Sequence, residues 1–258
     1  MSTATASPWS RVKPVAVGFG IAVAGFALGI AVSLLLLVVI VLGFGIELSD
    51  PELLIVQLIG LQGIGFPVVG YAYLRYTGRR LRTFVPTRVP SLREVGLIVA
   101  GWLGALVAVG LVSYLIQLLG LVPAENAAGQ VIMENPGFVP YLIPFVFLLN
   151  GPGEEFLFRG ILQGRFRESF GPAAAIVLAT LMFAPMHIVA LVGSPSAALV
   201  TISILTVPSL VFGALYEYTQ NFVVPALVHG LYNATLFGSV YIAARYGPEA
   251  GSQALLVL

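Results

Sequence analysis

Long apolar runs, separated by short polar segments, dominate the chain. Seven of these runs approach or exceed the roughly 20 residues that a helix needs to cross a bilayer. The pattern predicts transmembrane helices at residues 15–46, 53–76, 95–122, 138–163, 172–192, 197–215 and 222–244. The more polar segment 123–137 predicts a loop or a short surface helix. We therefore expect an all-α fold, a polytopic transmembrane helical bundle.

The composition supports a membrane protein. Of the 258 residues, 59% are hydrophobic and 9% are charged, whereas a soluble domain carries about 25% charged residues. One soluble core cannot hide so much apolar surface, so lipid is the expected solvent. The formal net charge of +1 argues against a nucleic-acid partner. The absence of cysteine excludes thiolate catalysis and cysteine-ligated zinc.

The loop charges are distributed unevenly between the two sides of the predicted bundle. One side carries Arg11, Lys13, Arg75, Arg79, Arg80, Arg82, Arg88, Arg93, Arg165 and Arg167. The other side carries Arg245 and the acidic residues Glu47, Asp50, Glu125 and Glu134. Because cytoplasmic loops are enriched in Lys and Arg, we expect a multi-pass protein of the cell membrane with a cytoplasmic N-terminus and an external C-terminus.

Two adjacent carboxylates and an arginine lie inside the fourth apolar run. Ionisable groups in a membrane span are costly, and they are functional candidates by default. Glu155 and Arg159 are four residues apart, so they share a helix face and can form an ion pair. Glu154 points about 100° away from Glu155 and is free for another task. We expect Pro152 to break the helix, which would place both glutamates near the N-terminus of a restarted segment.

The two histidines of the chain also lie inside apolar runs. Phe183 precedes His187 by four residues, and Asn233 follows His229 by four, so that His229 and Asn233 project together. A rise of ~1.5 Å per residue brings Glu154, both histidines and Asn233 into one layer about 12 Å thick. A carboxylate, two imidazoles and an amide at one depth indicate a site that holds water.

The polar residues form three motifs, in this order: Glu154-Glu155-x-x-x-Arg159, Phe183-x-x-x-His187 and His229-x-x-x-Asn233. The ordered set resembles the motifs of the CPBP family. These are the CAAX-protease and bacteriocin-processing intramembrane proteins, which include the type II CAAX prenyl endopeptidases. The resemblance covers roughly residues 150–236, whereas the first three spans are recognised only as generic hydrophobic helices.

The resemblance implies an intramembrane endopeptidase without a cofactor. Glu154, with His187, would activate a water molecule, and His229 and Asn233 would stabilise the oxyanion of the tetrahedral intermediate. The chemistry of the residues agrees with these roles. Peptide hydrolysis needs a base that takes a proton from water, and a carboxylate can supply it. An imidazole and an amide can supply the fixed donors that an oxyanion needs.

The resemblance further implies about eight transmembrane helices around a polar cavity open to the cytoplasm. Glu155, Arg159 and Phe183 would support the site. The sequence departs from this pattern, because it contains seven clear spans and too few residues for an eighth after position 244. We expect a single membrane domain over residues 1–258, with N-terminal helices at 15–122 and catalytic helices at 138–244.

Other interpretations of the same residues remain open. Glu154, His187 and His229 could furnish a zinc site with two histidines and one carboxylate, although no H-E-x-x-H helix is present. The bundle could also be a non-catalytic scaffold, an immunity protein, or a proton-coupled transporter. The expected partners are the lipid bilayer and a membrane-associated peptide or protein substrate, which could be prenylated.

Overall fold

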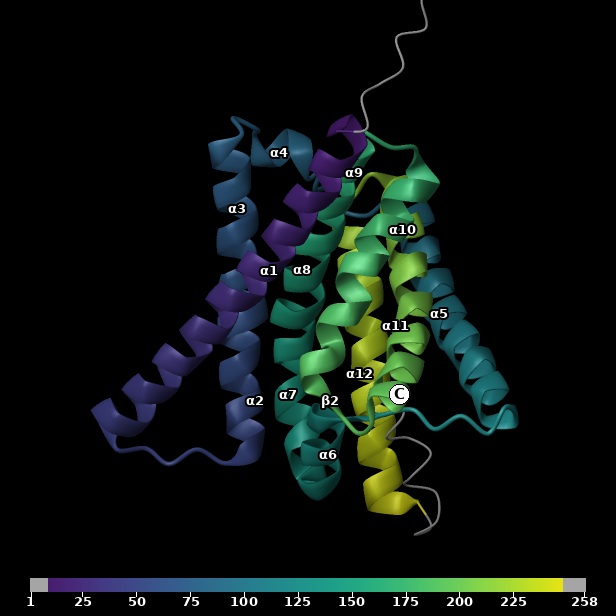
Figure 1. Ribbon diagram of the computed structural model, residues 1–258. Helices are drawn as coiled ribbons and strands as arrows, with labels where there is room; N and C mark the ends of the chain where they lie inside the picture. Colours follow the sequence, from purple (N-terminus) through teal and green to yellow (C-terminus); the bar gives the residue numbers. More distant parts are fainter. Residues whose placement is uncertain (1–8, 248–258) are drawn as a thin grey trace, which may run out of the picture.

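The computed structural model describes residues 9–247, which form a bundle of long helices (Figure 1). The first half contains α1 (Trp9–Val38), α2 (Asp50–Leu58), α3 (Phe66–Tyr76), α4 (Leu81–Phe84), α5 (Leu92–Leu118) and α6 (Ala127–Glu134). The second half contains α7 (Val139–Phe145), α8 (Gly151–Glu155), α9 (Gly164–Arg167), α10 (Pro172–Phe183), α11 (Pro195–Thr219) and α12 (Val223–Tyr246). The predicted all-α bundle is confirmed.

Short segments of other geometry link these helices. The π-helical turns are η1 (Val39–Gly43), η2 (Ile59–Gly65), η4 (Val146–Asn150) and η5 (Phe156–Gln163). The 3-10 turns are η3 (Pro136–Phe138) and η6 (Ala184–Ala190). Strands β1 (Glu125–Asn126) and β2 (Leu191–Val192) pair antiparallel. Segment 123–137 thus contains the short helix α6 that its polarity predicted.

Six helical stretches of residues 9–247 are long and apolar enough to cross a membrane. They are Arg11–Gly43, Asp50–Tyr76, Leu92–Leu118, Pro172–Ala190, Pro195–Thr219 and Val223–Tyr246. A bent pair, Ala127–Glu134 with Pro136–Arg167, turns through 99° and brings the count to as many as seven. In Figure 1, α7, α8 and α9 follow one another along the bundle, from the β2 end to the α4 end. The predicted seven spans agree with this upper count, and the described residues contain no eighth.

The helix that carries the acidic pair continues through Pro152, so the prediction of a break there is wrong. Asn150, just before this segment, has helical backbone angles of φ −63° and ψ −65°. The physical reason lies in the flanking π turns, η4 and η5, which widen the helix where proline has no N–H to donate. Glu154 and Glu155 are therefore mid-helix residues, and other side chains have to compensate their charge.

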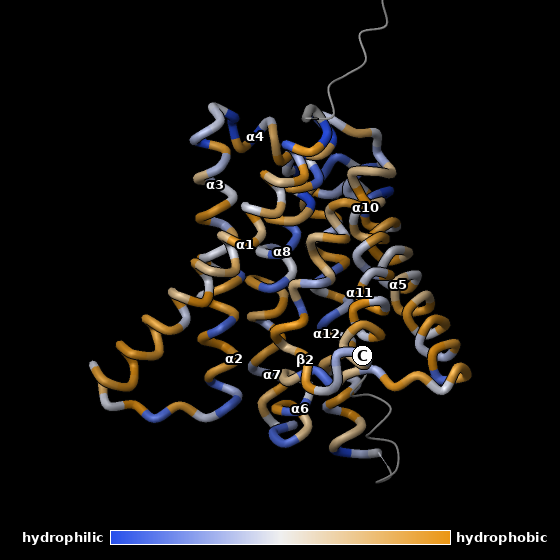
Figure 2. The backbone as a smooth tube through the Cα atoms, viewed as in Figure 1, coloured by the Kyte–Doolittle hydropathy of each residue, from blue (hydrophilic) through white to orange (hydrophobic). Residues whose placement is uncertain are grey.

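The two ends of the bundle differ in the polar residues that they carry. The arginine-rich loop around α4 lies at the same end as α9, and α6 and β2 lie at the opposite end (Figures 1 and 2). Arg79 pairs with Glu168 at 2.7 Å, and Arg167 pairs with Glu217 at 2.9 Å. These exposed pairs link the ends of separate helices, and each adds little stability.

Glycine allows the N-terminal helices to approach the helix of the acidic pair closely. A Cβ atom on Gly153 would lie 2.3 Å from the carbonyl oxygen of Gln62 in η2. Likewise, a Cβ atom on Gly65 would lie 2.5 Å from the Cα atom of Gly29 in α1. A larger residue at either position would force the backbones apart. These glycines therefore set the distance from α1, through η2, to α8.

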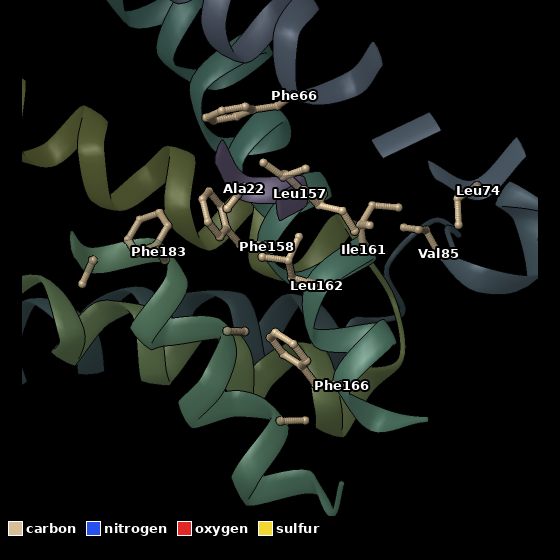
Figure 3. Close-up of a cluster of buried hydrophobic side chains, with 14 residues drawn as sticks. Ala22, Phe66, Leu74, Val85, Leu157, Phe158, Ile161, Leu162, Phe166 and Phe183 are labelled. Atoms are coloured by element: carbon tan, nitrogen blue, oxygen red, sulfur yellow. The ribbon is translucent and has the colours of Figure 1, made fainter. Parts of the chain in front are cut away.

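An apolar cluster packs around η5, the segment that directly follows the acidic pair (Figure 3). Most of its buried side chains come from α1, α3, η5, α9 and α10, and they include Ala22, Phe66, Leu157, Phe158, Ile161, Leu162, Phe166 and Phe183. Phe158 meets Phe66 and Phe183 edge-on, with ring centroids 5.9 Å and 5.1 Å away. This packing holds the helix of the acidic pair at a fixed rotation, because one face of it is committed to the cluster.

Candidate active site

Glu154 lies on α8 with 6% of its surface exposed. Its Oε1 atom accepts two hydrogen bonds, from Nε2 of Gln62 at 3.1 Å and from Nδ2 of Asn150 at 2.9 Å. Its Oε2 atom lies 3.7 Å from Nε2 of His229, which is beyond hydrogen-bond range. The two oxygens therefore have different environments. One is held by two amides, and the other faces an imidazole across a gap that a water molecule can bridge.

Glu155 is fully buried and links Arg159 to His229. Its Oε2 atom lies 3.2 Å from Nε of Arg159, so the predicted ion pair within the helix is present. Its Oε1 atom lies 2.9 Å from Nδ1 of His229 on α12. The buried Arg159 also donates to the carbonyl oxygen and hydroxyl of Ser209 on α11. Glu155 thus joins three helices in one charged network.

His229 is held by two aromatic rings and, at Nδ1, by Glu155. Its ring stacks on Phe212 at 4.8 Å, and Phe183 meets it edge-on at 6.1 Å. A carboxylate can only accept, so Nδ1 carries a proton toward Glu155. The remaining nitrogen, Nε2, faces Glu154. The ring orientation is therefore fixed by a carboxylate behind it, an arrangement that sets the tautomer of a working histidine.

Asn233 reaches the site through Asn150. Its Nδ2 atom donates to Oδ1 of Asn150 at 2.5 Å, and Asn150 in turn donates to Glu154. Both asparagines are half-buried. The structure therefore connects the predicted oxyanion residue to the predicted base through a shared amide.

His187 lies at the edge of this cluster, in η6. Its Nδ1 atom lies 3.2 Å from the carbonyl oxygen of Phe183, and its ring meets the Phe183 ring edge-on at 4.6 Å. The described residues give no hydrogen bond or ion pair between His187 and Glu154. The ring of Phe183 contacts the imidazoles of both His187 and His229. The predicted partnership of His187 with Glu154 remains a prediction.

Two residues at the site were not predicted, namely Gln62 and Asn150. Both are polar side chains in apolar runs, and such residues mark functional sites often enough to be a usable signal. Asn150 directly precedes the Gly-Pro-Gly segment before the acidic pair. Gln62 lies 92 positions away from Glu154 in the sequence, so no local spacing connects the two residues.

The alternative of a zinc site would require Glu154, His187 and His229 to converge on one metal ion. Within residues 9–247, no three His, Cys, Asp or Glu side chains are grouped as metal ligands would be. Glu154 and Glu155 approach His229, but Glu155 is already paired with Arg159. The choice between the two mechanisms is left to a chelation experiment.

Comparison with known proteins identifies the region that carries the three motifs. Residues 136–235 match the family model described as type II CAAX prenyl endopeptidase Rce1-like. This region is therefore similar to the Rce1-like family. The match confirms the resemblance drawn from the motifs, and it supports a CAAX-type protease that acts on a membrane-associated protein. No curated protein and no solved structure matches the chain.

The Rce1-like region begins at η3 and ends within α12. It contains Glu154, Glu155, His187, His229 and Asn233, and therefore all three motifs. It does not include α1, η2 or α3, which pack against it. Gln62 thus reaches the site from outside the Rce1-like region.

Proposed function

We propose that the protein is a glutamate-dependent intramembrane endopeptidase that hydrolyses a peptide bond of a membrane-associated, CAAX-type substrate. The carboxylate of Glu154 carries this proposal. Two amides hold its Oε1 atom, and its Oε2 atom faces Nε2 of His229 at 3.7 Å. This asymmetry suits a catalytic base, because one oxygen fixes the orientation while the other is left to take the proton.

In the first step, a water molecule binds between Glu154 and His229. Glu154 takes a proton from the water molecule while the oxygen of that water molecule attacks the carbonyl carbon of the scissile bond. The pair of electrons from the carbonyl double bond moves to the carbonyl oxygen, which becomes the oxyanion. The oxyanion then re-forms the carbonyl double bond, the bond between carbon and nitrogen breaks, and Glu154 gives its proton to the leaving amine. No covalent intermediate forms with the protein.

His229 and Asn233 stabilise the oxyanion. Because Nδ1 of His229 donates to Glu155, Nε2 can donate only when the ring is an imidazolium. The carboxylate of Glu155 stabilises that cation from behind, as the third member of a catalytic triad does. The amide of Asn233 has a second N–H besides the one given to Asn150, and it is free to donate.

His187 assists the base. Since a carbonyl oxygen can only accept, the contact of Nδ1 with Phe183 leaves the lone pair of the neutral ring on Nε2. That atom can accept a proton from the attacking water or orient it.

The substrate class follows from the family and from the position of the site. A C-terminal CAAX sequence carries a prenyl group on its cysteine, and such a chain dissolves in the apolar part of the bilayer. The excess of arginine at the α4 end favours an orientation in which that end and the N-terminus face the cytoplasm, and we propose that the substrate reaches the site from the same side. The external C-terminus follows from the same assignment.

The test uses purified protein in lipid vesicles and a fluorogenic peptide that ends in a prenylated CAAX sequence. Glu154→Gln should lower kcat by about 10²–10⁴-fold, and His229→Ala by about 10²–10³-fold. The matched control is Glu168→Gln, which changes an exposed glutamate of the arginine-rich end and should retain full activity. Variants at Glu154, His187, His229 and Asn233 that fold stably and cleave normally would contradict the proposal.

Two further measurements separate the alternatives. Activity that survives exhaustive chelation supports the glutamate mechanism, and activity that returns only with zinc supports the metal-dependent one. If the prenylated peptide is not cleaved, membranes of cells with wild-type protein and with Glu154→Gln are compared by proteomics. A cleavage product missing from the variant would identify another substrate, and identical membranes would favour the non-catalytic scaffold.

A further inference from the structure

A glutamine from the N-terminal helices touches the catalytic carboxylate. We infer that Gln62 is a positioning residue of the active site, which holds Oε1 of Glu154 so that Oε2 faces His229. The inference rests on the proposed function of Glu154 as the base. It assigns part of the site to η2, which lies outside residues 136–235, the region that matches the Rce1-like family.

The hydrogen bonds of Gln62 point to this role. Nε2 donates to Oε1 of Glu154 at 3.1 Å, and among the described residues the side chain makes no other hydrogen bond. Its own Oε1 atom is buried without a partner there. A buried amide costs free energy unless its groups are paired. An apolar residue would fill this position at lower cost, so the contact with Glu154 is the physical reason for a glutamine.

The backbone around Gln62 is shaped to make the contact. Gln62 is 8% exposed and lies within the π-helical turn η2, between Leu61 and Gly63. Its carbonyl oxygen approaches Gly153 so closely that a Cβ atom there would lie 2.3 Å away. Gly153 directly precedes Glu154. The close approach therefore sets the distance between the glutamine and the carboxylate.

The consequence for catalysis is a fixed carboxylate rotamer. Asn150 donates to the same oxygen, but it is four residues before Glu154 on the same helix. Gln62 donates from a different helix, so the two donors fix the carboxylate from two directions. Without Gln62, rotation about the last torsion of Glu154 could exchange the two oxygens. The oxygen held by Asn150 and the oxygen facing His229 would then no longer be distinct.

The experiment compares three substitutions in the prenylated-peptide assay. Gln62→Met keeps the size of the side chain and removes the donor, so kcat should fall about 10–100-fold with KM unchanged. Gln62→Glu can donate to Glu154 only while the new carboxyl is protonated. Its kcat, relative to wild type at the same pH, should therefore fall as the pH rises. Gln57→Met, five residues earlier on an exposed face of the same span, should match wild type.

A second control separates positioning from folding. Gln163 is fully buried, more so than Gln62, and it donates to the carbonyl oxygen of Gly213 and not to Glu154. Gln163→Met should cost at least as much thermal stability as Gln62→Met while retaining the kcat of wild type per folded molecule. A merely structural role for Gln62 would give equal losses of stability and of kcat in both variants, and no added pH dependence in Gln62→Glu.

The outcomes distinguish this inference from the proposed function. If Glu154→Gln is inactive but Gln62→Met has the kcat of wild type, the inference is overturned and the catalytic role of Glu154 stands. If Glu154→Gln is as active as wild type, the proposed function fails, and the role of Gln62 fails with it. A selective loss of kcat in Gln62→Met, together with the pH dependence of Gln62→Glu, supports the inference.

Discussion

Nδ1 of His229 lies 2.9 Å from Oε1 of Glu155, with both side chains buried. The two residues belong to different motifs and to helices far apart in the sequence. Their contact gives the second glutamate of the acidic pair a task of its own, which is to orient the imidazole that faces the first. The two adjacent carboxylates thus approach the same imidazole, Glu155 at Nδ1 and Glu154 at Nε2.

Glu155→Gln should therefore impair catalysis although Glu154 is intact. The amide is a poorer partner for Nδ1–H and does not stabilise an imidazolium, so kcat should fall by about 10²-fold or more. Nitrogen NMR of His229 checks the cause, because His187→Gln leaves one imidazole in the chain. In the His187→Gln variant, the NMR signals of His229 should show the proton on Nδ1. These signals should change when Glu155→Gln is added to that variant. An unchanged tautomer with full activity in the Glu155→Gln single variant would refute this role.

The buried ion pair predicts a large difference between two arginines. Removal of one partner from a buried pair leaves an uncompensated charge, so Arg159→Met should lower the free energy of unfolding by about 3–5 kcal/mol. Arg167→Met removes an exposed pair with Glu217 and should cost about 1 kcal/mol or less. Unfolding in detergent measures both. Equal losses in the two variants would contradict the network centred on Glu155.

The close approach of η2 and α8 predicts that Gly153 does not tolerate a side chain. Gly153→Ala should displace η2, break the contact of Gln62 with Glu154 and lower kcat by about 10-fold or more. The control is Gly104→Ala on α5, where a Cβ atom meets nothing within 4 Å. That substitution should be neutral or should stabilise its helix by about 0.5–1 kcal/mol. Normal turnover in Gly153→Ala would show that the spacing is not needed.

The orientation can be tested cleanly because the chain has no cysteine. Thr83 is exposed on α4 at the arginine-rich end, and Ser196 is exposed on α11 near β2 at the opposite end. A membrane-impermeant maleimide should label Ser196→Cys on intact cells and Thr83→Cys only after permeabilisation. The reverse pattern would place the arginine-rich end outside the cytoplasm and would contradict the arginine-based assignment.

The sequence predicted those features that depend on the residues of a single helix. Apolar run lengths located the spans within a few residues, and the spacing of Glu155 and Arg159 predicted their ion pair. It failed at Pro152, because π-helical turns absorb the missing N–H and the helix continues. It could not find the contacts of Gln62 with Glu154 or of Glu155 with His229, since these depend on how separate helices pack.

The central claim is that Glu154 activates a water molecule that attacks the substrate directly. The most direct test is a single turnover in water enriched in ¹⁸O, with the protein in excess over the prenylated peptide. We predict that the new carboxyl group of the product carries one ¹⁸O atom and that Glu154, recovered by proteolysis for mass spectrometry, carries none. A first-turnover product without ¹⁸O, accompanied by label in the carboxylate of Glu154, would show that this residue attacks the peptide bond itself.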